Sequence, residues 1–215
     1  MKATIASLIF LLLSLAVSSQ TYKYIGIEEG LSNQKIYRIQ KDARGYMWFL
    51  THVGIDRYNG KEIKHYKLKE GDRELDPLLN INWTYLDKTG TLLVTGKQGR
   101  IFRYDSGHDR FVQIYSMYNY WNKDYHAFVR YSYIDQESNV WLCDKSAIHL
   151  FNIESGQKQR ISNRLGNITC IEQINSEHFF IGTDKRIYLV KLENGNLKEL
   201  SCGKLEMMDM HVHEL

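Results

Sequence analysis

The stretch Asp42-Ala43-Arg44-Gly45-Tyr46-Met47-Trp48 decides the fold, because the segment Ile55-Asp56-Arg57-Tyr58 follows it and the two together recur along the chain. The further copies begin at Asp87, Asp135 and Asn175 and are followed by segments that begin at Ile101, Ile148 and Ile187. The isoleucine of the second segment moves from 55 to 101, 148 and 187, in steps of 46, 47 and 39 residues. A period of this size is typical of repeat architectures.

Each copy can be read as four short strands. In the first copy, Ile36–Gln40 is rich in β-forming residues, and the Asp-x-x-Gly sequence after it is typical of a turn. Met47–Thr51 is almost continuously apolar, which suits a strand that is buried on both faces. Ile55–Tyr58 and Glu62–Tyr66 flank Asn59-Gly60, a strong hairpin signal because a type I′ turn needs positive φ at both positions.

Four strands in each unit of about 40–50 residues predict an all-β fold, a β-propeller of four-stranded antiparallel blades. The predicted blades cover residues 31–66, 79–116, 127–162 and 166–201, and residues 205–215 would begin a fifth. We therefore expect an incomplete propeller, from the N-terminal part of a longer protein or from a truncated gene. The large residues expected to fill the gaps between blades are Trp48, Leu93, Trp141 and Phe180. Lys69 to Pro77 is predicted to be a charged loop.

Residues 1–19 have the pattern of a secretory signal peptide. Lys2 supplies a positive charge, Ile5 to Val17 is an apolar run broken by two serines, and small residues follow at the expected cleavage site. The run is shorter than the ~20 residues that span a bilayer. We expect an exported, periplasmic chain of residues 20–215, with a retained signal anchor as the alternative. The net charge of +3 is too small to indicate a nucleic-acid partner.

The chain has three cysteines, so at least one thiol is left without a disulfide partner. Their spacing matches no metal motif. Cys143 and Cys170 both fall in predicted strands, and we expect them to be buried as small apolar residues.

The region from Gly30 to Gly60 resembles the opening repeat of the two-component regulator propellers. It contains Gly-Leu-Ser-Asn, then Asp-x-x-Gly-x-x-Trp, then a glycine before an apolar-x-Arg-Tyr strand and an Asn-Gly turn. Weaker copies extend the resemblance over residues 22–201. The family forms the periplasmic sensors of hybrid two-component systems, which are abundant in gut Bacteroidetes.

The resemblance implies modules beyond these 215 residues. Family members usually carry two seven-bladed propellers, a β-sandwich, a membrane helix, a histidine kinase core, a receiver and a helix-turn-helix domain, and many sense oligosaccharides. We therefore expect the N-terminal portion of a ligand-sensing propeller that cannot signal alone. Its expected partners are an oligosaccharide or other small molecule, and the remaining blades of a longer chain or a second protomer. The full-length form is expected to be anchored in the inner membrane. A homodimer is one arrangement that is expected for it.

An aromatic-rich segment, Tyr115 to His126, lies at the junction of the second and third predicted blades and is the candidate ligand site. Aromatic faces can stack on the apolar faces of sugar rings, and amide groups can bond their hydroxyls. The candidate ligand-binding residues are Tyr118, Tyr120, Trp121, Asn122 and Tyr125. The alternative is that these aromatic residues pack between blades, as aromatic residues of propellers commonly do.

No arrangement of catalytic residues is evident, so no enzyme activity, cofactor or metal is expected for this chain. His211 and His213 would lie on one face of a strand, but a zinc site needs a third protein ligand in fixed geometry. Two other function classes stay open: a secreted propeller lyase or glycosidase that acts on polysaccharide, and a secreted scaffold that does not signal.

Overall fold

The computed structural model describes residues 22–118, 128–193 and 195–204. The predicted signal peptide and the predicted start of a fifth blade lie outside these residues, as do His211 and His213. None of the helices in the described part of the chain has the length and apolar character needed to cross a bilayer.

The first sheet shows how one repeat folds. Its strands are β1 (Ile36–Lys41), β2 (Met47–Thr51), β3 (Ile55–Tyr58) and β4 (Ile63–Tyr66), each antiparallel to the next. The predicted strands Met47–Thr51 and Ile55–Tyr58 are therefore confirmed to the residue. The tight turn at Gly60 has φ +97°, which an L-residue rarely adopts.

Three more four-stranded antiparallel sheets follow, and we refer to the four sheets as blades 1 to 4. Blade 2 consists of β7 (Trp83–Leu86), β8 (Leu92–Thr95), β9 (Arg100–Asp105) and β10 (Arg110–Ser116). Blade 3 consists of β11 (Tyr131–Ile134), β12 (Asn139–Cys143), β13 (Ala147–Asn152) and β14 (Lys158–Ser162). Blade 4 consists of β15 (Ile168–Gln173), β16 (His178–Thr183), β17 (Arg186–Glu193) and β18 (Asn196–Lys204).

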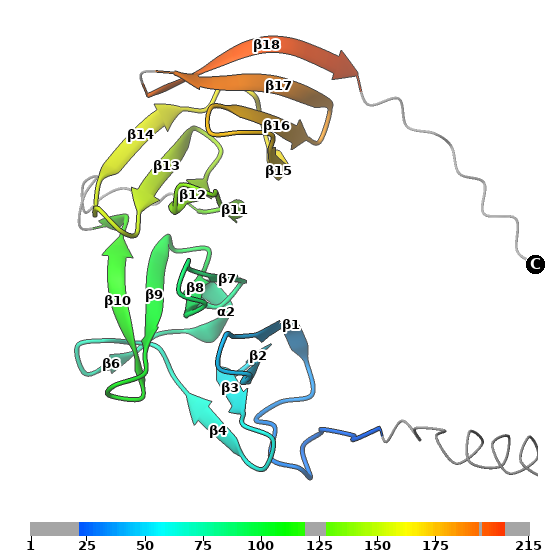
Figure 1. The fold of residues 1–215 in the computed structure, drawn as a ribbon, viewed down its shortest axis with the longest axis vertical. Coiled ribbons are helices and arrows are strands. Elements are labelled where there is room, and N and C mark those ends of the chain that lie inside the picture. Colours follow the sequence, from blue (N-terminus) through cyan, green and yellow to red (C-terminus); the bar gives the residue numbers. More distant parts are fainter. Residues whose placement is uncertain (1–21, 119–127, 194, 205–215) are drawn as a thin grey trace, which may run out of the picture.

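The four blades stand side by side in an open arc (Figure 1). The first strand of each blade lies on the concave side and the fourth on the convex side, and β1 contacts β7 while β11 contacts β15. This arrangement is an incomplete β-propeller, as the repeat predicts.

The apolar core lies between the blades. Trp48 of blade 1 packs with Leu92 and Val94 of blade 2. A second cluster joins blades 2 and 3 and includes Leu93 and Val140. A third joins blades 3 and 4. Its largest members are Trp141 and Phe179, whose ring centroids lie 4.8 Å apart. Neighbouring residues of one strand therefore serve two interfaces, because successive side chains point to opposite faces of a sheet.

Three of the four predicted gap-filling residues are fully buried: Trp48, Leu93 and Trp141. The prediction for Phe180 is wrong, because its side chain is 47% exposed. The alternation explains the difference. Phe179 and Ile181 point toward blade 3, so Phe180 points to the far face of blade 4, which no described residue covers.

The expectation of two buried cysteines is half correct. Cys143 is buried between blades 3 and 4, and this burial raises the pKa of its thiol well above the ordinary range. Cys170 is exposed, contrary to the prediction. A register shift between Ile168 and Cys170 interrupts the alternation of buried and exposed side chains in β15. Ile168 is therefore buried, whereas the Cys170 side chain points to the uncovered side of blade 4.

The predicted charged loop between blades 1 and 2 has structure of its own. It forms a small hairpin of β5 (Lys69–Glu70) and β6 (Arg73–Glu74), followed by the short helix α2 (Pro77–Asn80). Asp76 caps α2 by accepting a hydrogen bond from the backbone N–H of Leu78. The prediction treated the segment as irregular because charged residues hide the buried Leu75.

Candidate functional site

The repeated aspartate ties its own turn to the next strand. In blade 1, Asp42 Oδ1 accepts hydrogen bonds from the backbone N–H groups of Arg44 (2.9 Å) and Tyr46 (3.0 Å). Its other oxygen accepts one from Trp48 Nε1 at 2.8 Å. One buried carboxylate therefore closes the turn and fixes the indole that fills the gap to blade 2.

Blade 3 repeats this arrangement. Asp135 Oδ2 accepts hydrogen bonds from Trp141 Nε1 and Asn139 Nδ2, both at 2.8 Å, and Oδ1 accepts one from the Asn139 backbone N–H at 2.7 Å. Asp135 is 6% exposed and Trp141 fully buried, so water cannot substitute for the lost partners if either side chain is removed.

In blade 2 the repeated aspartate has a different partner, because Leu93 occupies the position that is tryptophan in blades 1 and 3. Asp87 Oδ1 still accepts the backbone N–H groups of Thr89 and Thr91, both at 2.9 Å. The guanidinium of Arg103 forms an ion pair with Asp87 Oδ2 at 2.6 Å, in place of an indole N–H. Burial opposes ionisation of Asp87, but the Thr89 hydroxyl, these backbone N–H groups and the Arg103 charge together lower its pKa.

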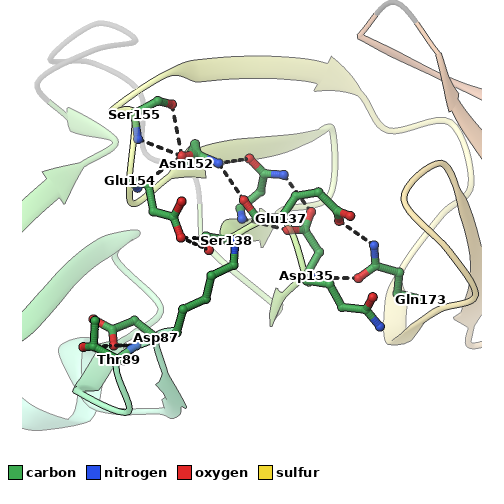
Figure 2. Close-up of polar contacts among 12 residues, drawn as sticks. Asp87, Thr89, Asp135, Glu137, Ser138, Asn152, Glu154, Ser155 and Gln173 are labelled. Carbon is green, nitrogen blue, oxygen red and sulfur yellow. Dashed lines mark hydrogen bonds and ion pairs between the residues drawn. The ribbon is translucent and has the colours of Figure 1, made fainter.

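The turns also link neighbouring blades to one another (Figure 2). Glu154 of blade 3 pairs with Lys88 of blade 2 at 3.2 Å and accepts a hydrogen bond from Ser138 at 2.7 Å. Gln173 of blade 4 accepts a hydrogen bond from the backbone N–H of Gln136 in blade 3 at 2.7 Å. It also donates one to the Glu137 carboxylate at 2.5 Å. A polar chain therefore runs across three blades along one edge of the arc.

Between blades 1 and 2, one link is the carboxylate of Asp109, in the turn between β9 and β10. It accepts hydrogen bonds from Arg57 (2.9 Å) and Tyr66 (2.6 Å), and also from Tyr104 and Lys64. Partial burial opposes ionisation, but these donors and the Arg57 charge hold the pKa of Asp109 well below its ordinary range. Burial and the bond to Asp109 raise the pKa of Tyr66.

The Gly-Leu-Ser-Asn sequence has a structural role in blade 1. Asp56, which is fully buried in β3, accepts hydrogen bonds from the Ser32 backbone N–H (2.7 Å) and hydroxyl (2.8 Å). Its other oxygen lies 2.8 Å from His65 Nδ1. The segment before β1 is thereby fastened to the middle of the blade, with Leu31 in the core.

Of the predicted ligand-binding residues, only Tyr118 is described. Its ring lies under the guanidinium of Arg100, 5.2 Å from the ring centroid. Arg100 in turn bonds to Gln98 at 2.5 Å and pairs with Glu70 at 3.3 Å. Tyr120, Trp121, Asn122 and Tyr125 lie outside the described residues, so the predicted site stays a prediction. Tyr115, in the same segment, follows the alternative reading: it is buried and stacks on Phe151 of blade 3.

Among the described residues, no group of three or more His, Cys, Asp or Glu side chains could hold a metal ion. The carboxylates of Asp42, Asp56, Asp109 and Asp135 each accept hydrogen bonds from donors of the scaffold. Their hydrogen bonds therefore stabilise the turns and strands of the blades.

Residues 30–52 match the family model of the two component regulator propeller. The matched segment contains the Asp42 turn and Trp48, so the first blade carries a repeat of this family. No curated protein matches the sequence.

Two solved structures show the same fold. One is the extracellular domain of a putative hybrid two component system from B. thetaiotaomicron, with 16% identity and a TM-score of 0.61 over 83% of this chain. The other is PorZ of Porphyromonas gingivalis, a surface component of the type-IX secretion system, with 14% identity and a TM-score of 0.58 over 86% of this chain. The alignments cover 26% and 25% of those chains, so this chain spans about a quarter of their length.

Asp135→Ala tests the role of the repeated aspartate. The variant leaves the buried Trp141 indole and the partly buried Asn139 donors without this acceptor, so we expect the free energy of unfolding to fall by about 3 kcal/mol. Asp135→Asn keeps one acceptor and should cost less. The exposed Asp72→Ala is the control and should change stability by less than about 0.5 kcal/mol. Urea unfolding followed by tryptophan fluorescence measures all three, and equal effects of Asp135→Ala and Asp72→Ala would contradict the assignment.

Asp109→Asn tests the link between blades 1 and 2 through its pH dependence. A lowered folded-state pKa contributes stability above the unfolded pKa of about 4, and this stability is lost as the pH falls below that value. The side chain is 36% exposed, so solvent screening limits the expected loss at pH 7 to about 1–2 kcal/mol. The difference from wild type should shrink between about pH 4 and pH 2. A difference that stays constant over this range would show that the charge of Asp109 is not responsible.

Proposed function

We propose that this chain is the N-terminal portion of an extracytoplasmic, ligand-sensing propeller of a hybrid two-component sensor histidine kinase, and that its ligand is an oligosaccharide. The observation that carries the proposal is the family match at residues 30–52, which coincides with the best copy of the repeat. The match favours a non-catalytic sensor domain over an enzyme. The fold likeness to the extracellular domain from B. thetaiotaomicron agrees with the proposal, although at 16% identity it concerns the fold alone.

The contacts described above suggest how such a domain would work. Because the turns and cores of neighbouring blades are joined by buried hydrogen bonds and aromatic packing, the blades should move together. A ligand bound to one edge can then act on the assembled sensor only through its different affinity for the resting and the active arrangement of subunits. The kinase modules that the family resemblance implies would respond to this change in the arrangement of subunits.

Deletion of the gene in the source bacterium tests this proposal. We expect the deletion strain to lose induction of one set of saccharide-degrading genes when grown on a panel of oligosaccharide fractions, with transcripts measured across the genome. Restoring the intact gene on a plasmid is the control. An unchanged response to every fraction would contradict the sensor function. Release of new reducing ends from polysaccharide by the purified chain would favour the enzyme alternative instead.

A further inference from the structure

A hollow of about 540 Å³ lies between blades 3 and 4, and half of its ten lining residues are cationic. Its lining includes five of them: Arg130, Lys145, Arg164, Lys185 and Arg186. All five are exposed, and none of them forms an ion pair within the described part of the chain. Asp184 is the one carboxylate in the lining, which leaves an excess of four positive charges in one small hollow.

The fold brings these charges together from segments far apart in the sequence. The strands β11 and β15 begin at this edge of the arc, and the β12–β13 and β16–β17 turns lie beside their starts. The backbone N–H of Asn163 donates to Ser146 O at 2.9 Å, and that of Asp184 donates to Asn167 O at 3.3 Å. We call this edge the strand-start edge. The turns of Asp42, Asp87 and Asp135 join β1 to β2, β7 to β8 and β11 to β12 at the opposite edge.

The chain as a whole carries a formal charge of only +3, so the excess of four charges is a local feature. The cavity between blade 1 and β10 offers a comparison, with a volume of about 510 Å³. There, Lys67 is paired with Glu74 at 2.7 Å, and Lys69 and Arg110 are the two lining cations without an ion pair among the described residues. The lining carboxylate Glu70 is paired with Arg73 at 2.7 Å. The five cations of the hollow between blades 3 and 4 form no ion pair with a described carboxylate, so a ligand anion would not have to displace one.

A second observation points to a hydroxyl-bearing ligand. The side-chain oxygen Oδ1 of Asn167, in the lining of the hollow, is buried and accepts no hydrogen bond from the described residues. An unpaired buried acceptor costs free energy, which a ligand donor would recover once the Asn167 side chain turned its oxygen toward the hollow. Tyr188 and Leu165, also in the lining, add partly buried apolar surface on which a sugar ring could rest.

We propose that this hollow binds an acidic sugar unit, that is, a saccharide residue that bears a carboxylate or a sulfate group. The inference rests on the proposed function in one respect, namely that the ligand is a saccharide. The volume lies within the ~300–1,000 Å³ of small-molecule sites. Arginine side chains can hold a carboxylate or sulfate through two parallel hydrogen bonds, while Asn167 accepts from a ring hydroxyl.

Calorimetric titration of the full chain tests the proposal with four probes: a uronate tetrasaccharide, a sulfated tetrasaccharide, a neutral tetrasaccharide and inorganic sulfate. We expect one of the two acidic tetrasaccharides to bind and the neutral one to bind at least about tenfold more weakly. Which acidic probe binds identifies the anionic group. The affinity should fall as salt is raised above about 0.15 M, because salt screens exposed charges.

Charge-removing variants locate the site. The double variant Arg164→Gln/Lys185→Gln should weaken binding of the acidic tetrasaccharide by about tenfold or more, since it removes two cations of the lining. Lys61→Gln, an exposed cation in the Asn59-Gly60 turn of blade 1, is the matched control and should have no effect. Thermal unfolding of each variant checks that it is folded.

Asn167→Ala tests the hydroxyl contact, and Asn82→Ala is its control. Asn82 Oδ1 is also buried without a partner, just before the first strand of blade 2, but Asn82 does not line the cationic hollow. Asn167→Ala should weaken the acidic tetrasaccharide and leave sulfate binding unchanged, while Asn82→Ala should affect neither. Loss of affinity for both probes in both variants would contradict the contact.

The remaining outcomes separate this inference from the proposed function. If the neutral tetrasaccharide binds as tightly as the acidic ones and the double variant binds equally well, the acidic site is wrong and the sensor proposal stands. If inorganic sulfate binds as tightly as either acidic tetrasaccharide, the hollow is a general anion site and its assignment to saccharide is overturned. If no probe binds, the inference falls, whereas the deletion experiment still decides the sensor function.

Discussion

The structure depends on a carboxylate that is buried in a turn. In blades 1 and 3, the aspartate at the start of the turn accepts hydrogen bonds from backbone N–H groups and from the indole of the tryptophan six residues later. The tryptophan is then held in the one orientation that fills the gap to the next blade. Local turn formation and packing between blades are therefore coupled through a single side chain, and a change in either one disturbs the other.

Blade 2 shows which part of this arrangement can vary. Leucine replaces tryptophan at position 93, and the buried aspartate acquires Arg103 as its partner. The requirement is therefore a partner for the second carboxylate oxygen, either a hydrogen-bond donor as in blades 1 and 3 or a cation as in blade 2. Asp109 also joins blades 1 and 2. Its carboxylate accepts hydrogen bonds from two tyrosines and two cationic side chains, which come from both blades. Each interface thus combines an apolar core with a few satisfied carboxylates near its edge.

The sequence repeat was sufficient to predict the blades, because its period and its turn residues are local features. The equivalent place of large apolar residues in the copies also predicted burial of Trp48, Leu93 and Trp141. It did not show that Phe180 faces an uncovered side of blade 4, since exposure depends on what stands beside the blade. Cys170 was misplaced because a register shift in β15 breaks the alternation, and no residue type marks such a shift.

The candidate site was harder to predict for a related reason. The hydrogen bond between Asp42 and Trp48 could have been anticipated from the constant spacing of Asp and Trp in blades 1 and 3. The cationic hollow could not, because its five charges are scattered over residues 130 to 186 and each looks like an ordinary surface residue. Only the stacking of blade 4 on blade 3 brings the strand starts and turns together.

Exchange of the indole N–H protons with solvent, followed by NMR on a sample labelled with ¹⁵N at the tryptophan side chains, tests the central claim most directly. The account predicts slow exchange for Trp48 and Trp141, whose N–H groups are buried and bonded to aspartate. Trp83, which is partly buried, is the internal reference and should exchange faster. If Trp48 and Trp141 exchange as fast as Trp83 in the folded protein, the aspartates do not hold the indoles and the account is wrong.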